Sequence, residues 1–325
     1  MLSHVVRRFL HALLVLWATF TATFLLLYAL PGDAALNKAG VGSDGSALDP
    51  ADLARLRAQL GLDQPLFVQY GKALLGALRG DFGTSIQTGK PAASLYFEAI
   101  PETLKLAGLA LLLGLTFGFA WALLAARTRV RLLRQALLAL PAVGVAVPTF
   151  WVGLVLIQFV SFRWGLLPAI GNDGLQSLIM PAVVLAIPTA STTAQLLYRS
   201  LEATLSAPYI ETARSWGASP GRTLLRHALR NSVIPVITAL GMTAGQLVGG
   251  SVVMETVFSR SGVGAVTVRA VDFQDTPVVL VAVVFAAAVF VTVNFLIDLL
   301  YPLIDPRIRM GAAGRAVPVR AGVAA

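Results

Sequence analysis

Six long apolar runs constrain this chain more than any other feature, because together they are far too apolar for a soluble fold to bury. They are Phe9–Leu30, Leu104–Ala126, Leu132–Val160, Leu178–Tyr198, Val233–Phe258 and Val278–Tyr301. A helix needs roughly 20 residues to cross the hydrocarbon core of a bilayer, and each run reaches that length. Backbone groups in lipid must be satisfied within the spanning segment, so each run is expected to be a helix. With 57% hydrophobic and 13% charged residues, the chain is predicted to be an all-α, polytopic membrane protein with a bundle of six transmembrane helices.

The positive charge gathers in segments that fall on one side when the six runs are threaded in order. The net charge is +9, and the arginines of that side are Arg7, Arg8, Arg127, Arg129, Arg131, Arg134, Arg199, Arg214, Arg222, Arg226, Arg230, Arg307, Arg309, Arg315 and Arg320. The positive-inside rule places these segments, and with them both termini, in the cytoplasm. Topology alone accounts for the charge, so no nucleic-acid partner is expected. A cleaved signal peptide is the alternative at the N-terminus, but Phe9–Leu30 exceeds the usual apolar core of about 7 to 15 residues.

The segment between the first two runs is the one sizeable part predicted to lie outside the bilayer. Asp49 is typical of a helix cap and Gly61 of a helix end, and a second helix is expected from Gln64 to Arg79, stopped by Gly80. A segment of about 70 residues with few aromatics buries little core, so a docking surface is expected rather than an independent enzyme domain. The predicted organisation is a cytoplasmic stub with the first helix at 1–30, an external segment at 31–100, a five-helix core at 101–301 with a cytoplasmic loop at 200–232, and a cytoplasmic tail at 302–325.

Prolines in the middle runs predict bent helices. Each of Pro141, Pro148, Pro181 and Pro188 removes a backbone donor, which a neighbouring group must compensate. The polar residues that follow Pro188 are Ser191, Thr192, Thr193 and Gln195. They either face a wet cavity or bond the backbone of their own helix.

A glycine stripe and three glutamines are further features of the middle and fifth runs. Gly241, Gly245 and Gly249 recur every four residues, which predicts close packing on another helix or, alternatively, a lining of the route. The polar side chains of the middle runs that could line the route are Gln158, Gln195 and Gln246.

Signatures of soluble enzymes and of ion-driven carriers are missing from the sequence. It has no Gly-x-x-x-x-Gly-Lys-Ser/Thr loop for nucleotide phosphates, no cysteine and only 3 scattered histidines. Ion-coupled transport needs ionisable groups near the bilayer midplane. Lys105, Arg199, Glu255 and Asp298 instead lie within about two turns of predicted helix ends, where such side chains snorkel or pair. We therefore expect a non-catalytic chain driven by a separate motor.

The polar stretch from Ser206 to Pro235 has the features of a short connector. Pro208 suits a first helical turn, Glu211 suits the positive end of the helix dipole, and Gly217 can end the helix in a left-handed conformation. These residues predict a helix of about two to three turns, too polar to insert into the bilayer.

A second helix is predicted directly after the first. Ser219 is its expected cap and Pro220 its first residue. Arg222, Arg226 and Arg230 recur every four residues along one face, which is interpreted as an attachment to anionic lipid of the inner leaflet.

The same stretch resembles the EAA loop of membrane subunits in binding-protein-dependent ABC importers. The match consists of Glu211, Ala213 and Gly217, with Thr212 where the pattern has its middle Ala. Downstream, R-H-A-L-R-N-x-x-I-P at Arg226–Pro235 resembles the dipeptide/oligopeptide/nickel branch. Shorter matches are G-L-D-Q-P at Gly61–Pro65, G-D-F-G-T-S at Gly80–Ser85, I-P-E-T-L at Ile100–Leu104 and D-P-R-I-R at Asp305–Arg309. Their order and spacing extend the resemblance over nearly the whole chain.

The resemblance implies a type I ABC importer permease that carries di- and oligopeptides across the bacterial cytoplasmic membrane by alternating access. A nickel or metal-chelate importer of the same family is the first alternative, and a motor-independent channel or secondary carrier is the second. The residues that it implies for docking to the ATPase subunit are Tyr209, Glu211, Thr212, Ala213, Arg214 and Gly217. Expected partners are a homologous second permease subunit, two ATPase subunits, an external solute-binding protein and membrane lipid. ATP and Mg²⁺ are expected on the ATPase subunits, and no cofactor or metal on this chain.

Overall fold

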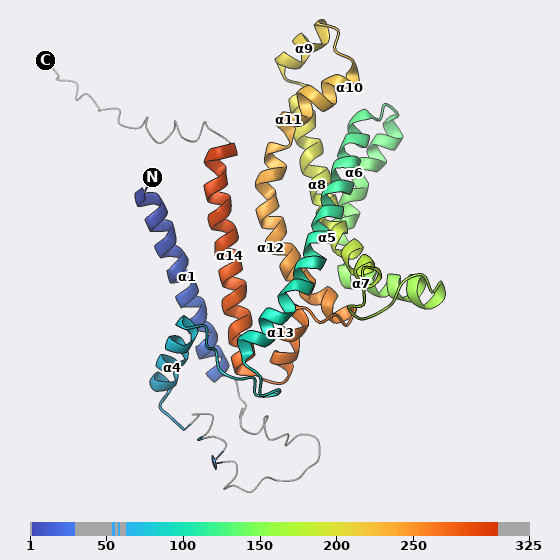
Figure 1. Cartoon of the computed structure of the whole chain (residues 1–325). Coiled ribbons are helices and arrows are strands. Elements are labelled where there is room, and N and C mark those ends of the chain that lie inside the picture. The colour runs from blue at the N-terminus through green and yellow to red at the C-terminus, as the bar shows by residue number, and fades with distance from the viewer. Residues whose placement is uncertain (1, 30–53, 56–57, 59–62, 305–325) are drawn as a thin grey trace, which may run out of the picture.

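The computed structural model describes residues 2–29, 54–55, 58 and 63–304, which form a bundle of helices (Figure 1). In chain order the elements are α1 Leu2–Ala29, α4 Leu66–Leu78, α5 Ala92–Arg127, α6 Arg131–Ala146, α7 Thr149–Leu156, η1 Ile157–Arg163, α8 Gln176–Leu205, α9 Pro208–Ser215, α10 Pro220–Arg222, η2 Thr223–Ala228, α11 Leu229–Ser232, α12 Ile234–Val257, α13 Val263–Asp272 and α14 Thr276–Ile304. The elements η1 and η2 are π-helices. Extended pairing in the described residues is limited to one isolated bridge, between Thr84 and Pro91. The predicted all-α fold is confirmed.

Helices occupy all six of the predicted apolar runs within the described part of the chain. Three of them, α1, α5 and α8, are long and apolar enough to cross a membrane without a break. The 36 residues of α5 extend over about 54 Å, well beyond a hydrocarbon core of about 30 Å. Two bent helix pairs raise the number of candidate spans to 5, and the last run coincides with α14. The number of helices that cross the membrane stays a prediction.

The third apolar run bends sharply at Pro148. α6 ends just before it, and the segment formed by α7 and η1 leaves at 93° to α6. Val147 has the extended conformation, with ψ 127°, that a residue before proline favours, and Pro148 has no N–H to continue the helix. The predicted span Leu132–Val160 is therefore broken at Pro148 into α6 and the segment of α7 and η1, and its crossing of the membrane stays a prediction. The other prolines lie inside α6 and α8 without ending them: Pro141, Pro181 and Pro188.

The described part of the segment that is predicted to be external is anchored to α1. The second predicted helix is confirmed as α4, and Gly80 follows it at φ +78°. Tyr70 of α4 packs against Phe24 of α1 with ring centroids 5.3 Å apart, and its hydroxyl group lies 2.8 Å from Thr21 Oγ1. The predicted helix from Asp49 to Gly61 falls almost wholly outside the described residues, as does the predicted tail.

The central helix of the bundle is α8, which packs closely on α5. Gly118 of α5 faces Thr193 of α8, and a Cβ atom on this glycine would lie 2.7 Å from the threonine Cβ. The hydroxyl group of Thr192 donates to the carbonyl of Pro188 at 2.9 Å, so this residue bonds its own helix. Ser191 instead lines a cavity between α5, α6 and α8.

The two ends of the bundle carry different elements (Figure 1). The start of α1, the end of α14, the turn between α5 and α6, and the α9–α10 connector lie at one end. α4, α13 and the start of α5 lie at the other end. This arrangement agrees with the predicted grouping of the segments between the apolar runs into two opposite sides. The assignment of the first end to the cytoplasm stays a prediction.

We expect single-cysteine labelling to place these ends on opposite sides of the membrane. The chain has no cysteine of its own, so Lys90→Cys and Arg129→Cys can each be labelled without background. Both side chains are exposed. A membrane-impermeant maleimide should label Lys90→Cys in intact spheroplasts and Arg129→Cys only after permeabilisation. The reverse pattern would overturn the predicted topology.

Candidate functional site

The connector after α8 is the first candidate site. Glu211 lies in the first turn of α9, and Gly217 follows the helix at φ +80°. The amide of Gly217 donates to the carbonyl of Arg214 at 2.9 Å, and the amide of Ala218 donates to the carbonyl of Ala213 at 3.1 Å. These two bonds form a Schellman motif, which reverses the chain. The predicted short helix ended by a left-handed Gly217 is confirmed.

The second helix of the connector begins as predicted but does not continue as a plain α-helix. Ser219 caps α10 by accepting a hydrogen bond from the amide of Arg222 at 3.4 Å, with Pro220 at the first position. The π-helix η2 then changes the helical register between Arg222 and Arg226. Arg230 and the other two arginines are all exposed, but the predicted continuous α-helical stripe is interrupted.

A single apolar side chain, Ile210, fixes α9 to the bundle. It is fully buried in a cluster that includes Ala122 and Ala125 of α5 and Leu197 and Leu201 of α8. Burying an isoleucine side chain stabilises a packed state by about 1.5 to 3 kcal/mol. The element that α9 packs against directly is η2, which shares this cluster, so a displacement of α9 reaches the rest of the bundle through η2.

Tyr209 lies at the base of the connector. Its hydroxyl group accepts a hydrogen bond from Asn231 Nδ2 at 2.9 Å and donates one to the carbonyl of His227 at 3.4 Å. The side chain is half-exposed and ties α9 to α11. The contact predicted for Tyr209 with an ATPase subunit stays a prediction.

The other residues predicted for docking lie on the free surface of the connector. Exposed are Glu211, Thr212, Arg214 and Gly217, and Ala213 is partly exposed. Within the described part of the chain, neither Glu211 nor Arg214 forms an ion pair. This surface is therefore available to another molecule.

Trp216 is a feature of the connector that the sequence reasoning did not single out. Its side chain is 86% exposed, directly before Gly217. An indole this exposed at the tip of a polar loop has no packing role within the described residues. The signal was present in the sequence, because an aromatic residue inside a stretch too polar to insert is typical of a protein interface.

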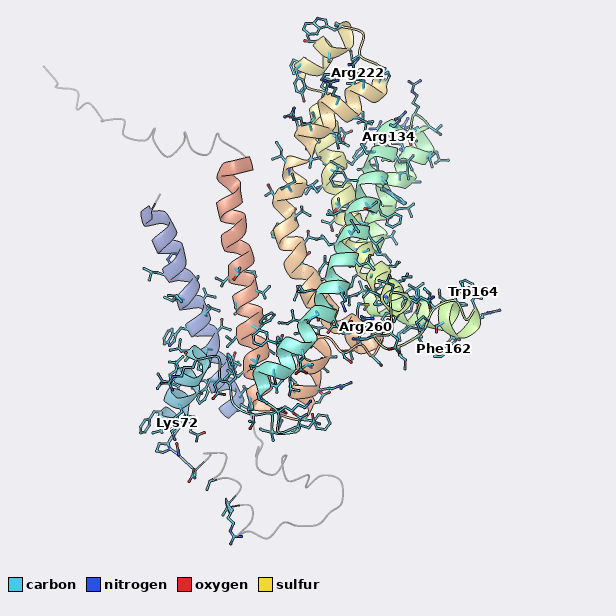
Figure 2. All side chains as sticks on the ribbon, in the orientation of Figure 1. Lys72, Arg134, Phe162, Trp164, Arg222 and Arg260 are labelled. Carbon is cyan, nitrogen blue, oxygen red and sulfur yellow. The ribbon has the colours of Figure 1, made fainter. Side chains whose placement is uncertain are left out.

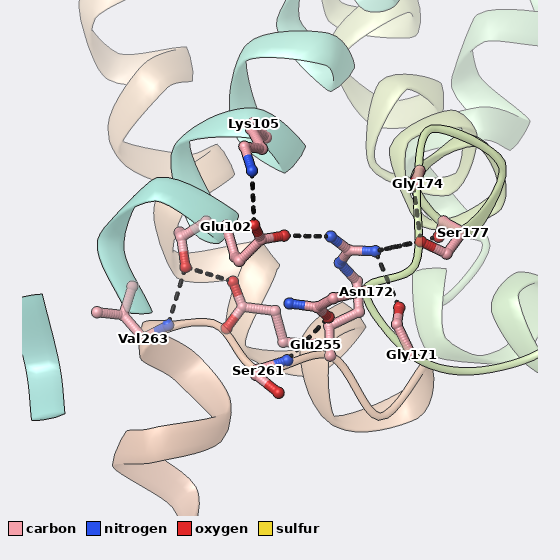
Figure 3. A network of polar contacts seen from close by, with 11 residues as sticks. Glu102, Lys105, Gly171, Asn172, Gly174, Ser177, Glu255, Ser261 and Val263 are labelled. Carbon is pink, nitrogen blue, oxygen red and sulfur yellow. Dashed lines mark hydrogen bonds and ion pairs between the residues drawn. The ribbon is translucent and has the colours of Figure 1, made fainter. Parts of the chain in front are cut away.

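A buried polar network at the opposite end of the bundle is the second candidate site (Figure 3). Arg260, 2% exposed, donates to Glu102 Oε2 at 2.9 Å and to the carbonyl oxygens of Gly171 at 3.1 Å and Ser177 at 3.2 Å. Glu102 also pairs with Lys105 at 2.7 Å. The arginine thereby joins the end of α12 to α5 and to the loop before α8.

Glu255 belongs to the same region, and its position corrects the prediction that it snorkels or pairs at a helix end. Its side chain is 1% exposed and accepts hydrogen bonds from Thr103 Oγ1 at 2.6 Å and from the amides of Gly264 at 2.7 Å and Ala265 at 3.3 Å. These amides belong to the first turn of α13, where the helix dipole favours a carboxylate. These hydrogen bonds could not be predicted from the sequence, because Thr103 lies on α5 and the two amides belong to α13.

Two glycines of the α12 stripe, Gly245 and Gly249, face open space within the described part of the chain. A Cβ atom on Gly245 or Gly249 would find no atom within 4 Å. The close packing on another helix, which is one of the two predictions for this stripe, is therefore not formed at these positions within the described chain. Gln246 is exposed on the same helix. Gln158 and Gln195 lie on separate elements, η1 and α8, and their role in lining a route stays a prediction.

The sequence matches two family descriptions that together cover most of the chain. Residues 114–310 match "Binding-protein-dependent transport system inner membrane component", and residues 1–107 match the N-terminal region of such membrane components. The "Glutathione transport system permease protein GsiC" of Salmonella paratyphi A is 36% identical over 309 residues, which are 95% of this chain and 99% of the relative. The protein of the same name from Escherichia coli K12 is 35% identical over 309 residues, again 95% of this chain and 99% of the relative.

A solved structure shares the fold at low sequence identity. It is described as an inward-facing conformation of the MetNI methionine ABC transporter, with a TM-score of 0.56 and 20% identity. The match covers 65% of this chain and 96% of the matched chain. At this identity the likeness concerns the fold alone.

Proposed function

The chain belongs to the family of binding-protein-dependent transport system inner membrane components, and we propose that it is an ABC importer permease for di- and oligopeptides. The curated relatives are named for glutathione transport, and glutathione is itself a short peptide. Their similarity extends over 95% of this chain, including all the helices of the core. A peptide substrate is therefore the reading that the relatives support best.

The contrast between the two sides of α9 carries the proposed mechanism. On one side the fully buried Ile210 joins a cluster shared with η2 and α8, whereas Glu211 and Arg214 on the other side are exposed and without ion-pair partners in the described residues. Such a surface suits docking into a groove of an ATPase subunit, as the EAA resemblance implies. The ATPase subunits bind ATP and Mg²⁺, and this chain needs no cofactor of its own.

Alternating access follows from this linkage. When ATP closes the two ATPase subunits, the connectors of both permeases are drawn together, and the movement passes from α9 through η2 to the end of α8. The opposite end of the bundle then opens to the outside, and hydrolysis resets it. ATP shifts the population because it binds the closed motor more tightly than the open one.

The complex contains, in this proposal, a homologous second permease, two ATPase subunits and an external solute-binding protein. The open face of α12 at Gly245 and Gly249 suits the second permease or the solute route between the two permeases. The end with α4 and α13 suits the binding protein, because it lies opposite the connector (Figure 1).

Replacing Trp216 with Ala is expected to weaken the binding of the ATPase subunit by at least about fivefold. Trp side chains are common hot spots of interfaces, and loss of one that is buried there costs more than about 1 kcal/mol. The affinity of the purified ATPase subunit for the permease pair in nanodiscs measures the effect. Trp164→Ala is the matched control, because Trp164 is another exposed tryptophan, at 60%, but lies far from the connector (Figure 2). Equal affinities for the two variants would argue against docking at the tip of the connector.

Two rival functions are tested by reconstitution. The permease pair, ATPase subunits and binding protein are placed in proteoliposomes, with labelled peptides or nickel chelates outside and ATP inside. We expect accumulation of peptide that requires ATP hydrolysis. Accumulation of chelate alone would favour the metal importer, and accumulation driven by an ion gradient without ATP would favour a carrier. Binding of the same solutes to the isolated binding protein gives an independent measure of the substrate class.

A further inference from the structure

An apolar cavity of about 350 Å³ lies between α5, α6 and α8. Phe117 and Trp121 of α5, Leu140 of α6 and Ile187 of α8 are among its lining residues, and Ser191 supplies a hydroxyl group. The indole N–H of Trp121 is already bonded to the carbonyl of Leu137 at 2.8 Å, so it offers no donor to a ligand. Phe117 is 60% exposed and Leu140 50% exposed, so the cavity opens on the outer surface of the bundle. Its chemistry suits a hydrocarbon chain.

An arginine lies at one end of this cavity. On α6, Arg134 precedes the cavity residues Pro141 and Gly144 by seven and ten positions, which places all three on one helix face. On α8, Tyr198 follows the cavity residue Ser191 by seven positions, again on one face. Arg134 Nη2 and Nε donate to the Tyr198 hydroxyl oxygen at 2.7 and 3.0 Å. The rise along α6 puts this pair about 10 Å beyond Pro141.

The surroundings of Arg134 are strongly basic. Arg127, Arg129 and Arg131 are exposed in the adjoining turn between α5 and α6, and they form no ion pair with other described residues. Figure 2 shows Arg134 and Arg222 at the same end of the molecule. The one carboxylate near Arg134 among the described residues is Glu202, at 3.3 Å, and both side chains of that pair are about half exposed. A basic rim therefore lies beside the end of an apolar cavity.

We propose that this cavity binds one acyl chain of an anionic phospholipid, whose phosphate is held by Arg134 and the arginines of the α5–α6 turn. Basic pockets between membrane helices on the cytoplasmic side are suited to anionic headgroups. The separation of about 10 Å between the arginine and the cavity lets the headgroup and the acyl chain be bound together. A peptide is disfavoured as the occupant, because the lining offers few polar groups to pair with its backbone.

The location of the site links lipid to the connector. Tyr198 and Leu137, which lie at its headgroup end, belong to the same buried cluster as Ile210. A lipid held there braces α6 against α8 at the level where α9 is anchored. The lipid proposal does not depend on which solute is carried, so it can fail while the proposed function stands.

The test measures lipid retained by the purified complex in nanodiscs. Native mass spectrometry counts phosphatidylglycerol bound to the wild type, to Arg134→Gln and to Ala190→Phe, which fills the cavity. We expect each variant to retain about fivefold less phosphatidylglycerol, the effect of losing one basic contact or the acyl site. Arg199→Gln is the matched control, because Arg199 is an exposed arginine on α8 outside the cavity lining. It should retain lipid like the wild type.

Three outcomes would overturn the proposal. The first is equal retention of phosphatidylglycerol by all variants. The second is displacement of the lipid by millimolar inorganic phosphate, which would mean that the acyl chain adds nothing. The third is cross-linking of a photoreactive residue at position 117 to the second permease rather than to lipid. Unfolding temperatures measured in phosphatidylcholine nanodiscs show whether a variant has lost stability rather than lipid binding. Arg134→Lys keeps the positive charge, so this variant should retain most of the phosphatidylglycerol that Arg134→Gln loses.

Discussion

Replacing Gly217 with Val should lower ATP-driven uptake by about tenfold or more, while the chain still inserts into the membrane. Gly217 has φ +80°, where a non-glycine residue costs about 1 to 2 kcal/mol and a β-branched one is a genuine outlier. A Cβ atom at this position would meet nothing within 4 Å, so the cost arises from the backbone and not from a clash. Relief of the strain breaks the Schellman bonds and turns the free surface of α9 away from its partner. Uptake in vesicles and the affinity for the ATPase subunit measure the loss.

Two further variants make this result specific. Gly217→Asn should be milder, because asparagine tolerates the left-handed conformation better than other side chains. Gly89→Val imposes a similar strain, at φ +73° and also with nothing within 4 Å, but at the opposite end of the bundle. It should leave the affinity for the ATPase subunit unchanged. An undiminished affinity for Gly217→Val would contradict the assignment of α9 as the docking element.

The connector could be predicted from sequence because its signals are local. Pro208, Gly217 and the Ser219–Pro220 pair each act on the backbone within one helical turn, so their effect does not depend on the rest of the fold. The apolar runs behave likewise, since their length alone requires helices in lipid. The burial of Ile210 could not be read this way. One isoleucine in a polar helix gives no sign of which distant helices will cover it.

The sequence predicts bends at the prolines, but neither the proline that ends a helix nor the buried network could be read from it. Four prolines lie in the third and fourth runs, but only Pro148 ends a helix, because neighbouring helices support the backbone around the others. Arg260 and Glu102 are 158 residues apart, and a charge near a predicted helix end looks the same whether it snorkels or is buried. Tertiary contacts decide between these outcomes, and a single sequence does not contain them in readable form.

Glu102→Gln is expected to destabilise the bundle by about 2 kcal/mol. Breaking one partner of a fully buried ion pair costs about 3 to 5 kcal/mol, and the side chain of Glu102 is 22% exposed, which lowers that figure. Glutamine keeps the size of the side chain and one acceptor oxygen, which can still bind Arg260, while its NH2 group replaces the oxygen that faces the exposed Lys105. Arg260 is then left 2% exposed, with carbonyl and hydroxyl oxygens as its remaining partners in the described residues. Thermal unfolding of the purified complex, followed by intrinsic fluorescence, measures the change.

Lys105→Gln is the matched control for this loss of charge. Lys105 lies 2.7 Å from the same carboxylate, but its side chain is 61% exposed, so its removal should cost less than about 1 kcal/mol. The double variant Glu102→Gln/Arg260→Met should recover part of the stability lost in Glu102→Gln, because the buried charge of Arg260 is removed together with that of Glu102. If Glu102→Gln and Lys105→Gln lowered the unfolding temperature equally, the charge of Arg260 would be compensated by something other than Glu102. The link that Arg260 makes between α12, α5 and the loop before α8 would then depend on its other contacts, such as the hydrogen bonds to Gly171 and Ser177.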